Sequence, residues 1–278
     1  RPVSSAASDV YKRQIEERYA KSIYAGIDQY GGENDTSYLI NLVMSNKISE
    51  KRINESVKRI LINKFELGLF DTPYVDEAEV KNKVNTKEYI DAGLEAQRKS
   101  IVLLENNGVL PLKENTKIFV DGLNKNVGKR FGTLVEDPAD ADVVIMYVHT
   151  VFNGNQESGL NRLFDNFLSI LFPNGDLNFN AEIKSKIKNY SKHNELIVVV
   201  DLNRPAILEE IKTFSSGLIG TFGVLDQVIY EGIFGKYNPS GKLPFEIPSS
   251  MDSVLNQKED MPDDSLNPSY DFGYGISY

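Results

Sequence analysis

The chain contains no cysteine and only two histidines among its 278 residues. Without cysteine it can form neither disulfides nor thiolate metal sites, and it has no cysteine nucleophile. The two histidines, His149 and His193, lie far apart in the sequence, which gives little support to a zinc site. We therefore expect neither a metal nor another cofactor.

Long apolar runs are also missing, and the 31 basic residues are outnumbered by 40 acidic ones. No stretch approaches the ~20 apolar residues of a membrane-spanning helix. The formal net charge is −9 at pH 7, and it stays negative when the first residues are set aside. Phosphate binding needs clustered Lys and Arg. The composition therefore predicts neither a membrane nor a nucleic acid as a partner.

The first 14 residues are interpreted separately. Residues 4–14 read as the in-frame translation of a transposase adapter used to prepare sequencing libraries, and all eleven amino acids match that translation. We expect residues 1–14 to be an adapter-derived, disordered artefact. We also expect the chain to begin inside a longer reading frame. The alternative is a natural polar arm.

The next segment, residues 15–72, has a helical pattern. One apolar stripe recurs at helical spacing and comprises Ile53, Val57, Ile60 and Leu61. Gly68 stands where a helix would end. A charged stretch with little apolar content follows, which predicts a linker at 73–92. The helices alone do not complete a core, so we expect this stripe to stay exposed in isolation.

From residue 93 onward, short apolar runs alternate with helical stretches. Strands are expected at 101–104, 118–120, 143–148, 196–200 and 218–222. Helices are expected at 86–99, 180–192, 204–214 and 224–235. The nearly continuous hydrophobicity of the runs is typical of parallel strands covered on both faces. The fold class is therefore α/β, a three-layer sandwich over residues 93–248.

The last segment alternates aromatic residues with glycine. A turn at Asn238–Gly241 predicts a short strand that Pro248 ends. Residues 249–278 are expected to form a tail packed on the sandwich. Two roles remain open for its aromatic residues, which either pin the terminus to the core or line a sugar-stacking surface: Tyr270, Phe272, Tyr274 and Tyr278.

Several blocks, in order, resemble glycoside hydrolase family 3, and more closely its bacterial β-glucosidase-like branch. They lie at residues 17–28, 52–71, 97–112, 201–208 and 257–262, together with 234–248 and 271–278 at the end of the chain. The resemblance implies an (α/β)6-type sandwich preceded by the last helices of a TIM-like barrel. Residues 15–72 would be those helices, truncated.

The resemblance also implies a chemistry. It is that of a retaining, exo-acting β-glycosidase on β-linked oligosaccharides or glycosides, in which a carboxylate nucleophile and a second carboxyl act across ~5 Å. The nucleophile would sit in a Ser-Asp motif on a barrel strand upstream of Ile15, and outside the adapter-like residues 4–14 the chain has no Ser-Asp pair. Asp28 lies near the implied pocket but is not the nucleophile. We therefore expect the chain alone to be inactive. Members of the family are often periplasmic or secreted, and the compartment of this protein stays open.

The family places its acid/base on a loop after a central strand of the sandwich. Glu157 is the first carboxylate after the strand expected at 143–148, and it is our candidate. It departs from the commoner Gly-Glu-Gly-Tyr pattern, so a solvated loop residue is the alternative.

Three other polar residues have both a functional and a structural interpretation. His149 follows a buried strand and is either an acid/base or ligand residue or a hydrogen-bonding partner within the fold. Asp201 ends a strand where open α/β sheets bind ligands, and its alternative is a pair with Arg204. His193 lies in a polar turn and is expected to be exposed.

Two other classes of function remain. The departure around Glu157 is compatible with a non-catalytic carbohydrate-binding or scaffold protein that kept the second domain. The sheet pattern alone suggests a flavodoxin-like nucleotide binder, but the chain lacks the glycine-rich phosphate-binding motifs.

Overall fold

The computed structural model describes residues 5–31, 34–150, 176–258 and 261–278, and for residues 5–14 the backbone alone. It divides the chain into two compact units, Arg1–Val84 and Asn85–Tyr278. The division falls inside the segment for which the sequence predicts a linker.

The first unit is helical. Its elements are α1 (Ser5–Tyr24), α2 (Ser37–Met44), α3 (Glu50–Glu66), η1 (Glu77–Glu79) and α4 (Val80–Lys83). The Ser49 hydroxyl caps α3 by accepting from the Arg52 N–H, and Gly68 follows the helix with a φ of +67°, as its C-terminal position requires. Helix α1 begins at Ser5, within the segment expected to be disordered. Residues 5–14 contain neither Gly nor Pro, so nothing in their sequence ends the helix there.

The core of this unit is small. Ile23, Leu42 and Ile48 are its buried hydrophobic cluster. On α3, Val57 is 44% exposed and Leu61 is 37% exposed. The apolar stripe of α3 is thus only partly covered within its own unit.

The second unit is built on a mixed sheet. Its strands are β1 (Val102–Asn106), β2 (Lys117–Asp121), β3 (Thr133–Leu134), β4 (Val143–His149), β5 (Glu195–Asp201) and β6 (Gly217–Thr221). The strand order is β1-β6-β5-β4-β2-β3. All pairs are parallel except β1 with β6. The antiparallel edge strand departs from the expected parallel sheet, because an apolar run reports burial and carries no information about strand direction.

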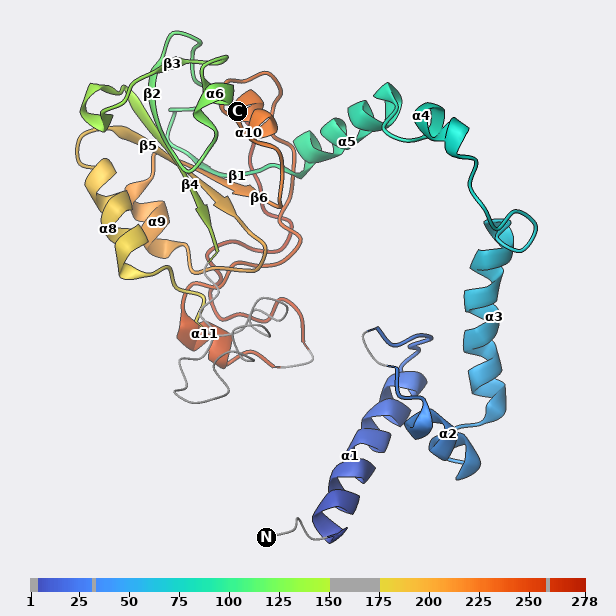
Figure 1. Cartoon of the computed structure of the whole chain (residues 1–278). Coiled ribbons are helices and arrows are strands. Elements are labelled where there is room, and N and C mark those ends of the chain that lie inside the picture. Colours follow the sequence, from blue (N-terminus) through green and yellow to red (C-terminus); the bar gives the residue numbers. More distant parts are fainter. Residues whose placement is uncertain (1–4, 32–33, 151–175, 259–260) are drawn as a thin grey trace. The chain divides into compact units, whose positions relative to one another are not determined.

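Helices cover both faces of the sheet (Figure 1), which confirms the predicted three-layer α/β sandwich. The helices of this unit are α5 (Lys87–Ser100), α6 (Lys125–Gly128), η2 (Pro138–Asp140), α8 (Ala181–Tyr190), α9 (Glu209–Phe214), α10 (Asp226–Ile233) and α11 (Met251–Leu255). One cluster joins the sheet to α10, and the opposite cluster joins it to α8 and α9. Across the described part of the chain, no helix is long and apolar enough to cross a membrane.

The C-terminal segment crosses the β1 edge of the sheet. The strand expected before Pro248 does not form as a regular element. Instead, single bridges join Leu103 to Ile276 and Ile247 to Tyr270. Backbone hydrogen bonds link Gly241 to Ile101 and Leu243 to Tyr274. The irregular path follows from this close approach, since a Cβ on Gly241 would lie 2.4 Å from the Ile101 carbonyl oxygen.

We expect Gly241→Ala to destabilise the second unit strongly. The added methyl group would meet backbone, which cannot rotate away as a side chain can, so the segment must leave β1. Overpacking of this kind costs about 1–3 kcal/mol. Thermal unfolding followed by circular dichroism measures it. Gly93→Ala is the matched control, because a Cβ there meets no atom within 4 Å; equal melting temperatures for the two variants would contradict the packing described.

Candidate functional site at the carboxyl edge of the sheet

The parallel strands bring polar side chains to one edge of the sheet. The strands β2, β4, β5 and β6 end at Asp121, His149, Asp201 and Thr221. Their register sets His149 opposite Asp201, and Asp201 opposite Thr221. Ligands of open α/β sheets bind at this edge, so the residues that gather here form the candidate site.

The carboxylate of Asp201 is contacted by several polar groups at this edge of the sheet. The residue is 4% exposed. Its Oδ1 accepts from the Gly223 N–H at 2.9 Å, and its Oδ2 accepts from the Asn203 amide at 2.9 Å. His149 Nδ1 lies 3.2 Å from the same Oδ2. These contacts offset the free-energy cost of burying the Asp201 carboxylate.

Tyr147 packs beside this pair. Its ring meets the His149 ring edge-on, with 4.9 Å between centroids. Burial raises the pKa of Tyr147 to about 12, and the charge of Asp201 and a hydrogen bond to it add to the effect. The phenol is therefore neutral at physiological pH and serves as a hydrogen-bond donor to Asp201.

A second polar group lies at the end of β2. Asp121 Oδ2 receives Lys186 Nζ at 3.0 Å and the Tyr190 hydroxyl at 3.1 Å, both from α8. The hydrogen bond and charge of Asp121 raise the pKa of Lys186. Burial, together with Asp121, raises that of Tyr190. This group ties α8 to the sheet, and its charges are already paired.

The structure tests some of the sequence-predicted site residues. Glu157, the candidate acid/base, lies outside the described residues. His193 is exposed, as predicted. His149 does hydrogen-bond within the fold, yet its side chain is 67% exposed. The pairing of His149 with Asp201 was missed, because they stand 52 positions apart and only the order of the strands makes them neighbours.

Three of the four tail tyrosine and phenylalanine residues pin the terminus. The Tyr270 hydroxyl donates to Glu105 Oε1 at 2.8 Å, and the Tyr274 hydroxyl donates to the Leu104 carbonyl at 3.3 Å. The Tyr278 hydroxyl donates to the Gly232 carbonyl. Phe272 alone is 61% exposed. The pinning interpretation is therefore confirmed for these tyrosines.

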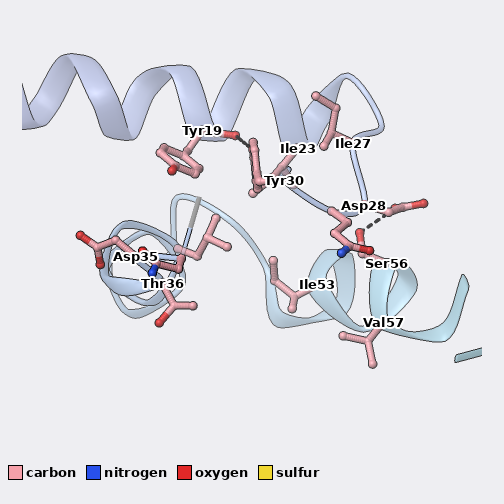
Figure 2. Close-up of a pocket in the computed structure, with 13 residues that line it drawn as sticks. Tyr19, Ile23, Ile27, Asp28, Tyr30, Asp35, Thr36, Ile53, Ser56 and Val57 are labelled. Carbon is pink, nitrogen blue, oxygen red and sulfur yellow. Dashed lines mark hydrogen bonds between the residues drawn. The ribbon is translucent and has the colours of Figure 1, made fainter. Parts of the chain in front are cut away.

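A separate pocket lies within the first unit. It has a volume of about 290 Å³, and its wall is mainly apolar, with Asp28 on one side (Figure 2). Asp28 Oδ1 accepts from the Ser56 hydroxyl at 2.7 Å and from Arg59 at 2.8 Å. The Ser56 hydrogen bond, followed by Arg59 and Arg52, lowers the pKa of Asp28. The carboxylate is thus engaged in holding the loop after α1 against α3.

Metal ligands do not gather in the part of the chain that the structure describes. Nowhere within 5–31, 34–150, 176–258 and 261–278 do three His, Asp or Glu side chains lie together as a metal site would require. Among the described residues, the carboxyl edge of the sheet offers carboxylates, the His149 imidazole, tyrosine hydroxyls and the Lys186 ammonium group.

Comparison with known proteins gives this site its context. Residues 120–278 match the glycosyl hydrolase family 3 C-terminal domain. The chain is 33% identical over 263 residues to a periplasmic beta-glucosidase/beta-xylosidase of Dickeya chrysanthemi, covering 94% of this chain and 39% of that protein. It is 34% identical over 270 residues to beta-glucosidase C of Emericella nidulans, covering 94% of this chain and 42% of that protein.

Solved structures agree on the fold. A beta-glucosidase from Listeria innocua superposes with a TM-score of 0.65 at 22% identity, over 93% of this chain and 44% of that one. Beta-glucosidase 3B from Thermotoga neapolitana gives a TM-score of 0.62 at 17% identity, over 93% and 48%. The chain thus spans less than half the length of these relatives. It belongs to glycoside hydrolase family 3, and residues 120–278 are the family's C-terminal domain.

Proposed function

We propose that the complete protein hydrolyses terminal β-linked sugars, with β-glucosides and β-xylosides as the first substrates to examine. The observation that carries this proposal is the family match over residues 120–278, joined by relatives named beta-glucosidase and beta-xylosidase. The reaction proceeds with retention, through a glycosyl–enzyme ester on a carboxylate nucleophile.

The 278-residue chain supplies only part of this machinery. It spans 39% of the Dickeya chrysanthemi relative. Its one Ser-Asp pair, Ser8-Asp9, lies in the adapter-like residues 4–14 and on helix α1, not on a barrel strand, so it does not provide the nucleophile. The chain by itself therefore does not turn over a glycoside, and the complete protein does.

Glu157 is the acid/base in this proposal. Its support is its place in the sequence, in the segment that follows β4. The carboxyl end of that strand is where this fold holds ligands. The acid protonates the leaving oxygen as the glycosidic bond breaks. The resulting carboxylate then takes a proton from the water that hydrolyses the ester.

The test compares the complete protein with the 278-residue chain on 4-nitrophenyl β-glucoside and β-xyloside. We expect nitrophenol release from the complete protein alone. Absence of turnover in both, together with binding of glucose or cellobiose by calorimetry, would contradict the enzyme and favour a carbohydrate-binding protein.

A further inference from the structure

The exposed imidazole of His149 is hydrogen-bonded to the buried carboxylate of Asp201. The His149 side chain is 67% exposed, whereas that of Asp201 is 5% exposed, and Nδ1 lies 3.2 Å from Oδ2. The two residues are direct register partners on β4 and β5. The backbone therefore holds both ends of the contact, and the Tyr147 ring, 4.9 Å away and edge-on, limits rotation of the imidazole.

The surroundings of Asp201 decide where the proton of His149 lies. The Gly223 N–H and the Asn203 amide both donate to this carboxylate. An ionised carboxylate only accepts hydrogen bonds, so Nδ1 of His149 must be the donor. When the ring is neutral, Nε2 then carries no hydrogen and becomes an acceptor. The pair presents one oriented acceptor at the carboxyl edge of the sheet.

We propose that His149 contacts the sugar substrate, accepting a hydrogen bond from a sugar hydroxyl through Nε2, and that Asp201 is its positioning residue. This inference rests on the proposed function. Sugars carry many hydroxyl groups, and each can donate a hydrogen bond to an acceptor such as Nε2 of His149. The Asn203 side chain beside Asp201 restricts which way the carboxylate, and with it the ring, can turn.

The orientation can be tested on the 278-residue chain without any activity. His149 and His193 are its only histidines, so ring-nitrogen NMR shows just two imidazoles, and exposed His193 is the internal reference. At a pH where both rings are neutral, we expect the Nδ1–H tautomer at His149. Asp201→Ala should remove this preference. An Nε2–H tautomer at His149 in the unmodified chain would overturn the proposal, whether or not the variant folds.

The contact itself is tested in the complete protein. His149→Ala should lower kcat/KM for 4-nitrophenyl β-glucoside about twofold to tenfold, the range for one neutral hydrogen bond. In a set of glucosides that each lack one hydroxyl, the unmodified protein should act more slowly on the one that lacks the hydroxyl bound by His149. For that substrate, His149→Ala should cause no further loss of kcat/KM. His193→Ala is the control and should match the unmodified protein.

Failure of the sugar contact and failure of the proposed function give different results. Turnover that His149→Ala leaves unchanged, or lowers equally for every deoxy substrate, would overturn the sugar contact while the proposed function stands. A complete protein that turns over no glycoside would overturn the proposed function and the sugar contact with it. The NMR result would then still report the His149–Asp201 orientation.

Discussion

Replacing Glu157 by Gln in the complete protein should lower kcat/KM for a β-linked disaccharide by about 10²- to 10⁴-fold, the usual contribution of an acid/base. When the glycosidic bond of a disaccharide breaks, the second sugar is a poor leaving group unless the glycosidic oxygen is protonated, and glutamine cannot supply that proton. A dinitrophenyl β-glucoside leaves without such help, so formation of its glycosyl ester should slow far less. Steady-state and burst kinetics on both substrates measure the difference.

The assignment of Glu157 has a matched control and a chemical check. Asp165 is the next carboxylate along the chain, and Asp165→Asn should retain the activity of the unmodified protein. Sodium azide should accelerate Glu157→Gln and yield the β-glycosyl azide, because azide needs no general base to attack the ester. Full disaccharide turnover by Glu157→Gln would contradict the role assigned to it.

The second large effect concerns the independence of the two units. We expect a chain of residues 85–278 to unfold cooperatively on its own, since both faces of its sheet are covered by buried clusters. Residues 1–84 should not do so. Their core consists of Ile23, Leu42 and Ile48, and Val57 and Leu61 of α3 remain exposed. Each large apolar side chain left in water forgoes roughly 1.5–3 kcal/mol.

Hydrogen exchange on the 278-residue chain measures this contrast directly. Amides of β4 and β5, in the middle of the sheet, should exchange at least roughly 100-fold more slowly than those of α3, because local opening of a poorly packed helix needs little free energy. Uniform protection across both units of the chain would contradict this expectation.

Much of the sandwich could be predicted because its strands are buried on both faces. Runs such as 143–148 and 196–200 appear in the sequence as uninterrupted apolar segments, and they become β4 and β5. The two-residue β3 could not be found this way, since Thr133–Leu134 is too short to show a period. Helix α11 was missed as well. Its signal is local, a Ser250 hydroxyl that accepts from the Ser253 N–H.

The candidate site was only half visible in the sequence. Position after a strand marked both His149 and Asp201 as edge residues. Their contact required β4 and β5 to be neighbours in register, which no local pattern specifies. The Gly223 N–H, which donates to Asp201 Oδ1, lies just after the end of a third strand, β6. Sites assembled from several strand ends therefore need the topology before their members can be grouped.

The stereochemistry of the reaction tests the central claim most directly. Proton NMR of the complete protein acting on 4-nitrophenyl β-glucoside would show which anomer of glucose forms first. A retaining enzyme that works through a glycosyl ester must release β-glucose, with α-glucose following only as the sugar mutarotates. Release of α-glucose first, or no release of glucose at all, would contradict the account.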